Sequence, residues 1–487
     1  MEKNKTSIIK NFMYNMVYDV LILVLPLVTT PYLSRVLGAE TIGIYTYTYA
    51  ILSYFILFGC LGISLYARRE LAYVRDDLKK RNKLFWELVI FRFITVTIAS
   101  VIYYFTFALK GEYSLYYKLW LLELAATAIN ISWFFQAIEE FKKTVARNTI
   151  VRLASVLLIF IFVKSPSDLA LYILIYGVAD LIGNISLWFY LPKYMRGERV
   201  GRLTVMRHLP FVLLLFIPQI ASQVWVILDK SMIGAMLEDK AELGFYEQAQ
   251  KIVNVIITVI TSVATVMLPR MANTYAKGDT KQLRDYLNKS LNFVSLLSIP
   301  MVFGLIAISK DFVPIFFGQG YDRVVGINYI VSCTIWLMSV ITILGNQYLL
   351  ITGKQKQYTI TILLGLGLNA ILNYIFIKLF KAEGAGVASV ITQLLVITMQ
   401  FGLIKNEIKV LDYLKLSIKY VIVSLIMFVV CFVVGYFATG VTSIILQVLL
   451  GAVTYFGILY FMRDEYLMMI TNRVFGSIKA KFSKSNA

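Results

Sequence analysis

Charged residues are scarce in this sequence. Asp, Glu, Lys and Arg make up 15% of the 487 residues, against about 25% in typical soluble domains. Hydrophobic residues make up 59%, and the mean hydropathy is +0.74. The charges are too few to cover soluble cores of this total size, and they cluster between long apolar runs. The composition therefore excludes soluble, disordered and collagen-like proteins, and it indicates a protein that crosses a membrane many times.

Histidine and cysteine are also rare. The three cysteines (Cys60, Cys333 and Cys431) lie within apolar runs, so the sequence predicts no disulfide framework. His208 is the single histidine. We interpret it as an ordinary side chain of a basic loop, because one histidine argues against a metal site built on histidine. The segments between apolar runs are too short for a soluble domain. We therefore expect no metal, no cofactor and no enzymatic activity.

Long apolar runs take up most of the chain. A helix needs about 20 apolar residues to cross the hydrocarbon core of a bilayer. Fourteen segments meet this requirement, at 12–36, 43–67, 85–108, 115–138, 146–164, 168–190, 211–236, 246–268, 290–308, 325–351, 358–380, 385–404, 413–436 and 441–462. We number these predicted spans 1 to 14.

The positions of Lys and Arg indicate the orientation of the spans. Cytoplasmic loops carry an excess of these residues. With the N-terminus in the cytoplasm, most of the 47 Lys and Arg residues fall in predicted inner segments and few in outer ones. Fourteen spans with both termini cytoplasmic fit this pattern. The net charge of +19 thus has a topological origin, and it does not indicate a nucleic-acid partner, which would need a basic face on a soluble module.

Two segments resemble each other at an offset of 201 residues. They are AETIGIY (39–45) and KAELGFY (240–246), in which Gly43 aligns with Gly244. Further matches at this offset or one residue beyond are Tyr45 with Tyr246, Arg69 with Arg270 and Asp77 with Asp279. Six spans separate the two copies. Because this number is even, the copies have the same orientation in the membrane.

The predicted fold class is an all-α polytopic membrane protein with two pseudo-symmetric six-helix bundles. We place the N-terminal bundle at residues 1–200 and the C-terminal bundle at 201–405. Spans 13 and 14 follow as an additional helix pair at 406–463, and a basic cytoplasmic tail occupies 464–487. In this arrangement, spans 1, 2, 7 and 8 hold equivalent places in the two bundles.

Ionisable residues inside spans are informative, because each costs about 2.5–3.5 kcal/mol at the bilayer centre on insertion scales. Spans 9 to 14 have none away from their ends. In spans 1 to 8 they are Asp19, Arg92, Glu123, Arg152, Asp180, Asp229, Lys230, Glu247 and Lys251. We therefore expect a polar pathway among the first eight spans. Asp19, Glu123 and Asp180 are the candidates for binding a coupling ion.

Structural explanations stay open for several of these charges. Glu247 and Lys251 are four residues apart with Glu first, which is a favourable helix pair. Arg92 and Arg152 lie near the predicted cytoplasmic interface and can extend to it. Asp180 lies nearest the midplane and is the hardest to explain in this way.

Three segments resemble a known family. They are PLVTTPYLSRVLGAETIGIYTYTYAI (26–51), LDKSMIGAMLEDKAELGFYEQAQKI (228–252) and the segment 351–393, which begins ITGKQKQYTITILLG. They are similar to the polysaccharide repeat-unit flippases of the MOP exporter superfamily. This superfamily also contains the lipid II flippases and the MATE multidrug exporters. The resemblance covers nearly the whole chain.

The resemblance implies a function for the chain. Such flippases move undecaprenyl-pyrophosphate-linked oligosaccharides from the inner to the outer leaflet by alternating access, for capsule or exopolysaccharide biosynthesis. We also expect a bacterial plasma membrane location, contact with membrane lipids, and as possible partners a coupling ion (H+ or Na+), a polysaccharide polymerase and glycosyltransferases.

The resemblance also implies a cationic cavity lined by spans 1, 2, 7 and 8. Arg35, Asp229 and Lys230 lie in its matching motifs. The full set of substrate-binding candidates is Arg35, Arg69, Asp229, Lys230, Lys251 and Arg270. Acidic and basic residues inside the spans balance once Arg35 is included, so the sequence does not itself show a strongly cationic cavity.

Three other functions are alternatives. A MATE-like exporter of small molecules would couple cation entry to drug efflux, and Asp19 and Asp180 suit that role. A lipid II-type flippase differs only in its substrate. A membrane polymerase or glycosyltransferase would need a large outer loop or a D-x-D motif, and the sequence has neither.

Overall fold

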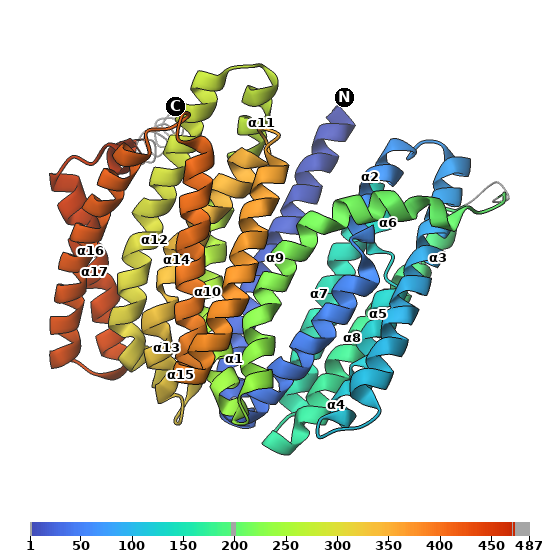
Figure 1. Cartoon of the computed structure of the whole chain (residues 1–487), viewed down its shortest axis with the longest axis horizontal. Coiled ribbons are helices and arrows are strands. Elements are labelled where there is room, and N and C mark those ends of the chain that lie inside the picture. The colour runs from blue at the N-terminus through green and yellow to red at the C-terminus, as the bar shows by residue number, and fades with distance from the viewer. Residues whose placement is uncertain (1, 196–200, 470, 473–487) are drawn as a thin grey trace, which may run out of the picture. The chain divides into compact units, whose positions relative to one another are not determined.

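The structure is a computed structural model that describes residues 2–195, 201–469 and 471–472. The description omits the side chains of residues 2–23, 217–219, 221–222 and 263–265. The described residues form helices joined by short turns, and they contain no strand (Figure 1). The predicted all-α class is confirmed.

Helices succeed one another along the whole described chain. Up to residue 236 they are α1 (Glu2–Cys60), α2 (Ile63–Tyr73), α3 (Leu78–Tyr103), η1 (Tyr104–Ala108), α4 (Ser114–Leu119), α5 (Leu121–Ala128), α6 (Ser132–Ala137), α7 (Phe141–Phe162), η2 (Pro166–Asp168), α8 (Leu169–Trp188), η3 (Leu191–Lys193), η4 (Val205–His208) and α9 (Leu209–Met236). From residue 240 they are α10 (Lys240–Thr265), α11 (Leu268–Ala276), α12 (Thr280–Phe317), α13 (Asp322–Val331), α14 (Cys333–Thr342), η5 (Ile343–Leu349), α15 (Gln355–Ile404), α16 (Val410–Phe437) and α17 (Gly440–Phe461).

Two long helices each contain two predicted spans. The backbone of α1 breaks at Gly38, where φ is 77°, a conformation that glycine adopts readily because it has no Cβ. Figure 1 shows the chain turning back within α1. In α15 a similar break lies at Lys381, where φ is 54°. Spans 1 and 2 therefore meet at Gly38, and spans 11 and 12 meet at Lys381.

The helices are long and apolar enough for a membrane protein. Eight in the described residues meet this criterion, or nine if the bent pair α13 and α14 with η5 forms one span. Helices also occupy all fourteen predicted spans apart from short breaks. The protein is thus a multi-pass membrane protein, while the count of fourteen and the cytoplasmic termini stay predictions.

The chain divides into two compact units, Met1–Gly244 and Phe245–Ala487. The predicted bundles divide instead at residue 200. The two divisions differ because α9, which follows residue 200, packs against α1 and α2. The predicted boundaries at residues 200, 405 and 463 describe a repeat in the sequence rather than a contact boundary, and they stay a prediction.

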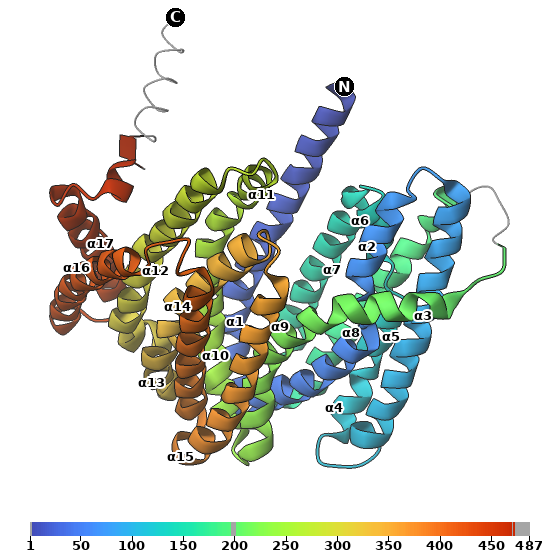
Figure 2. The ribbon, with the colours of Figure 1, turned by 45° about the horizontal axis from the view of Figure 1, so that its top comes forward.

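In the first unit, α1 packs against α3, α7 and α9, and α8 packs against α5 and α7 (Figure 2). Two apolar clusters fill the spaces between these helices. The first is built around Leu52, Tyr103, Trp120, Ile159 and Tyr172. The second is built around Phe85, Leu88, Trp133, Phe134 and Leu187. Because lipid tails are as apolar as these side chains, close van der Waals packing stabilises the clusters rather than removal of apolar surface from water.

A buried arginine lies at the break between α1 and α2. Arg92 of α3 is 4% exposed. Its guanidinium donates to the Thr127 carbonyl at 2.8 Å, the Ser64 hydroxyl at 3.0 Å and the Cys60 sulfur at 3.4 Å. Arg92 thus ties both sides of the break to α5. It does not extend to the membrane surface, which was one expectation from its position.

Replacing Arg92 with leucine should lower the free energy of unfolding by about 1–3 kcal/mol, because buried acceptors lose their charged donor. The apparent melting temperature of the purified protein in detergent measures this effect. Arg202→Leu is the control, since Arg202 is exposed. Equal melting temperatures for the two variants would contradict the assigned role of Arg92.

The second unit is organised around α12, which packs against α13, α14, α16 and α17. The predicted additional pair of spans thus has a defined partner. Tyr455 of α17 donates its hydroxyl to the Leu296 carbonyl of α12 at 2.9 Å, and Asn292 donates to the Tyr466 hydroxyl at 2.7 Å. Lys419 and Asp464 form an ion pair at 2.6 Å. Most of the predicted basic tail, 464–487, lies outside the described residues.

Local structure repeats at the offset that the sequence predicts. Asp77 caps α3 by accepting a hydrogen bond from the Lys80 amide at 3.0 Å. Asp279 caps α12 by accepting one from the Gln282 amide at 2.9 Å. Both residues act as N-caps, for which Asp is favoured. Each also follows a short helix, α2 in one case and α11 in the other, so the two copies share a local pattern.

Candidate functional site

Two acidic residues and one arginine come together inside the first unit. Glu123 of α5 lies within hydrogen-bond range of Asp180 of α8, and Arg152 of α7 is near Glu123. All three side chains are half-buried. They come from three helices that pack together, so the cluster depends on the packing of α8 against α5 and α7.

Aromatic side chains surround this cluster. The Arg152 guanidinium lies 5.9 Å from the centre of the Tyr176 ring. Tyr49 of α1 lies near Glu123, Arg152 and Asp180, and its ring lies 5.2 Å from that of Trp120. Tyr49 is nevertheless 41% exposed. Arginine over an aromatic face gains a favourable cation–π interaction, which helps to hold Arg152 beside the two acidic groups.

The charges of this cluster suit the binding of a cation. With both carboxyl groups ionised, the two acids and Arg152 leave one excess negative charge. A proton or a monovalent metal ion would neutralise it, and such neutralisation is favourable away from bulk water. The sequence predicted Glu123 and Asp180 as ion-binding candidates separately, and the structure brings them together. Asp19, the third candidate, lies on α1 where side chains are outside the described residues.

The predicted substrate-binding residues of the first unit have different surroundings. Arg35 of α1 is exposed and donates to the Pro31 carbonyl at 3.2 Å. Arg69 of α2 is 46% exposed and forms an ion pair with Glu70 at 2.9 Å. Asp229 of α9 is 7% exposed, and its neighbour Lys230 is half-buried. The charge of Arg69 is partly neutralised by Glu70 on the same helix, whereas Lys230 directly follows the buried Asp229 in the sequence.

The other two predicted substrate-binding residues lie in the second unit. Lys251 is half-buried on α10, and Arg270 is exposed on α11. Arg270 occupies the short helix that corresponds to α2, so the predicted equivalence of Arg69 and Arg270 extends to their local structure. The assignment of all six residues to substrate binding stays a prediction. No group of three or more His, Cys, Asp or Glu side chains that could hold a metal occurs in the described residues.

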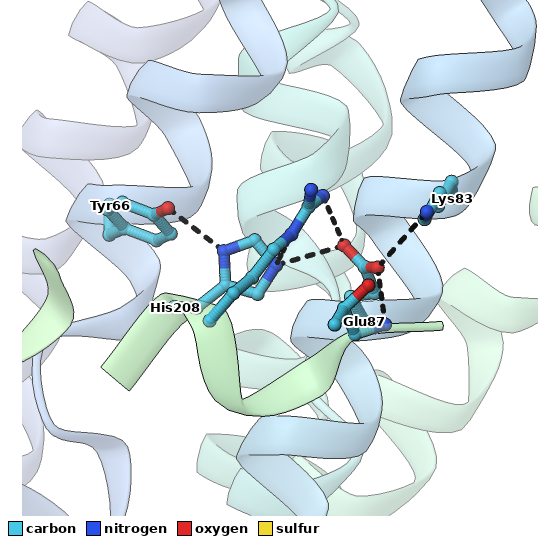
Figure 3. Close-up of polar contacts among 6 residues, drawn as sticks. Tyr66, Lys83, Glu87 and His208 are labelled. Atoms are coloured by element: carbon cyan, nitrogen blue, oxygen red, sulfur yellow. Dashed lines mark hydrogen bonds and ion pairs between the residues drawn. The ribbon is translucent and has the colours of Figure 1, made fainter. Parts of the chain in front are cut away.

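A polar cluster that the sequence did not predict is centred on Glu87 of α3 (Figure 3). Its carboxylate accepts from the Thr204 amide at 2.7 Å, from Arg207 at 2.5 Å and from the His208 Nε2 at 3.0 Å. Lys83 lies 3.9 Å away. We call Glu87 with these loop partners the Glu87 clasp. It fixes the loop that precedes α9 to α3.

His208 connects the clasp to α2. An ionised carboxylate only accepts hydrogen bonds, so the His208 Nε2 donates to Glu87 and its Nδ1 accepts from the Tyr66 hydroxyl at 2.9 Å. Burial lowers the pKa of His208, although the hydrogen bond that His208 donates to Glu87 raises it. The interpretation of His208 as an ordinary loop side chain is wrong, because the structure buries it to 3% exposure. Two features of the sequence could have indicated this cluster: a lone histidine in a basic loop, and an acidic residue at the start of an apolar run.

Comparison with known proteins gives a family match and several similar proteins. The sequence model of the family described as "Polysaccharide biosynthesis protein" matches residues 8–275, more than half of the chain. The MatE family model matches residues 215–375. A putative O-antigen transporter of Escherichia coli (strain K12) is 27% identical over 416 residues, which cover 84% of this chain and 99% of that protein.

Other similarities cover a shorter part of the chain or concern the fold. A probable low-salt glycan biosynthesis flippase of Haloferax volcanii is 28% identical over 167 residues, which cover 34% of each chain. Among solved structures, the lipid II flippase MurJ in an inward closed conformation has a TM-score of 0.75 at 19% identity, over 93% of this chain and 99% of that one. An inward-facing MATE family transporter has a TM-score of 0.58 at 14% identity, over 80% and 94%. These structural similarities show the fold.

Proposed function

Because the chain belongs to the polysaccharide biosynthesis protein family, we propose that it is a flippase for lipid-linked saccharides. The observation that carries this proposal is the match to a putative O-antigen transporter over nearly the full length of that protein. The all-helical, multi-pass structure supports it, because a flippase must surround its substrate within the membrane. The MurJ-like fold is a second support.

We further propose the chemical form of the substrate and the route. The substrate is an oligosaccharide repeat unit on undecaprenyl pyrophosphate, and it moves from the inner to the outer leaflet by alternating access. Its pyrophosphate and sugars cannot cross hydrocarbon unaided, because burying unpaired charge is costly. Lys and Arg side chains bind phosphate oxygens through charge-assisted hydrogen bonds. No bond is made or broken in this process, so the protein is not an enzyme. Its products would supply capsule or exopolysaccharide assembly.

A reconstituted system tests the proposed function directly. Vesicles that contain the purified protein are loaded with a radiolabelled lipid-linked oligosaccharide. An enzyme that cannot enter the vesicles is then added, and it acts only on the fraction of oligosaccharide exposed on the outer surface. We expect exposure to rise faster than in protein-free vesicles. Equal rates in active and protein-free vesicles would refute the proposal.

Lys230 and Arg35 are the proposed contacts for the pyrophosphate. Replacing both with alanine should slow saccharide movement about a hundredfold or more, because each charge-assisted hydrogen bond contributes about 1.5–3 kcal/mol and two are lost. The vesicle assay measures the rate, and immunoblotting confirms insertion. Lys110→Ala with Lys310→Ala is the control pair, since both side chains are exposed in predicted outer loops. Full activity of the Lys230 and Arg35 variant would refute the assignment.

We propose that Glu123 and Asp180 bind the coupling ion, H+ or Na+. The support is their closeness to each other and to Arg152, with an excess negative charge when both are ionised. An ion that binds this cluster only in one state of the transporter would shift the balance between states.

A cation-coupled exporter of small molecules is the second candidate function. The match of the MatE family model to residues 215–375 favours it. Cation-dependent efflux of a fluorescent dye from proteoliposomes, without movement of lipid-linked saccharide, would support this candidate over the first. A lipid II-type flippase is distinguished by offering lipid II and the repeat-unit lipid in competition.

A further inference from the structure

Two glycines in the first unit lie against carbonyl groups of a facing helix. A Cβ added to Gly43 of α1 would fall well inside 3.0 Å of the Lys240 carbonyl oxygen. A Cβ added to Gly244 of α10 would fall equally close to the Ala39 carbonyl oxygen. Both obstacles are backbone atoms, which cannot turn aside as a side chain can. The two helices therefore approach each other closely enough that only glycine fits at either position.

The two contacts are copies of each other. Gly43 and Gly244 are 201 residues apart, and so are Ala39 and Lys240. This is the offset of the sequence repeat. The repeat therefore relates the contact of Gly43 with Lys240 to the contact of Gly244 with Ala39. A two-fold symmetric interface has the same property, because each contact in it occurs twice. We call this double contact the glycine seal.

Neighbouring residues extend the seal along α1 and α9. The Lys240 ammonium donates to the carbonyls of Gly234 and Leu237 at the end of α9, both at 2.7 Å. The ring of Tyr47 packs directly on Gly234. Further along, the hydroxyls of Tyr54 and Ser231 are hydrogen-bonded at 2.9 Å. From Gly43 to Tyr54 the contact follows one face of α1 for about 16 Å, or three helical turns.

We propose that the glycine seal is the closing point of one mouth of the transporter and that it parts and re-forms in each cycle. In the predicted topology this is the outer mouth. At Gly43 and Gly244 the helices meet backbone to backbone, so this part of the contact can separate and return by rigid-body movement with few side chains to repack. Pseudo-symmetry supports this role, because equivalent helices of two repeats can close on the same axis. This inference rests on the proposed function, which supplies the need for alternating access.

Alanine substitutions with an accessibility readout test the inference. Gly43→Ala and Gly244→Ala are made singly in a protein whose three cysteines are replaced and whose Tyr54→Cys reports access from outside. Tyr54 lies on the same face of α1 as Gly43, deeper from the mouth. We expect a membrane-impermeant maleimide applied to intact cells to label the reporter about tenfold faster, because overpacking raises the free energy of the closed state.

Gly304→Ala and Gly367→Ala are matched controls. Both are helical glycines at which an added Cβ meets nothing within 4 Å, so they share the change in helix propensity without the overlap. They should label at the background rate. Unchanged labelling of both test variants at normal membrane levels would overturn the inference. The labelling needs no substrate, so it remains readable even if the protein fails to move lipid-linked saccharide, which would refute only the proposed function.

A second measurement leaves both glycines in place, in case alanine prevents folding. Cysteines replacing Tyr54 and Ser231 are joined by a short reducible cross-linker, which should hold the mouth closed. Saccharide movement should stop on cross-linking and return on reduction. Movement that continues after complete cross-linking would overturn the inference.

Discussion

Gradient-driven saccharide movement should fall about tenfold or more in the Glu123→Gln variant, because ion binding and substrate movement are typically coupled by about 1–3 kcal/mol. Glutamine keeps the size of the side chain but removes its charge, so the cluster with Asp180 and Arg152 no longer carries excess negative charge. Asp180→Asn should have a similar effect. The measurement is the initial rate in vesicles with an imposed proton or sodium gradient.

The control variants for this test keep the same chemical change at exposed sites. Glu465→Gln and Asp412→Asn alter acidic residues that lie on the surface of the second unit. They should move saccharide at the normal rate. If Glu123→Gln and Asp180→Asn respond to the gradient as the unmodified protein does, the cluster is not the ion-coupling site. Slow movement without a gradient should persist in both, since the substrate contacts proposed at Lys230 and Arg35 remain.

Replacing Glu87 with glutamine should lower the free energy of unfolding by about 2–3 kcal/mol, because a buried group would be left with mismatched partners. The Glu87 side chain is 0% exposed. Glutamine would direct an NH2 group at partners that all donate: the Thr204 amide, Arg207 and the His208 Nε2. The apparent melting temperature in detergent and the amount of protein in the membrane measure the loss.

Glu139→Gln is a matched control for the Glu87 test. Glu139 also pairs with an arginine, Arg75, at 2.9 Å, but its side chain is 65% exposed. Exposed ion pairs contribute about 0–1 kcal/mol, so this variant should melt close to the unmodified protein. If Glu87→Gln is no more destabilised than Glu139→Gln, the clasp does not hold the loop that precedes α9.

The Glu87 clasp and the glycine seal lie at opposite ends of α9. The clasp fixes the loop before α9 to α2 and α3. At the other end, Lys240 caps α9, and Gly234 receives the ring of Tyr47. These contacts explain why α9 belongs to the first compact unit although the repeat assigns it to the second bundle.

The amino-acid sequence alone decided the class of the protein and much of its plan. Low charge and long apolar runs require helices, because a backbone in hydrocarbon must satisfy its hydrogen bonds within each segment. Hydropathy is a local property, so the helical segments are readable without the fold. The offset of 201 residues paired Gly43 with Gly244 and, one residue further, Asp77 with Asp279. The sequence alone gives this pairing, because a repeat preserves the positions of its turns and helix caps.

Tertiary packing decided which side chains meet. Glu123 and Asp180 are separate acids in the sequence, and only the packing of α5 against α8 makes them one cluster. Glu87 finds its partners more than a hundred residues away, and Arg69 finds its partner in Glu70 on its own helix. Helices that are apolar on most faces give little signal of which face turns inward. Their rotations, and hence the pairing of their few polar groups, are set by close packing between neighbours, which is a property of the whole fold.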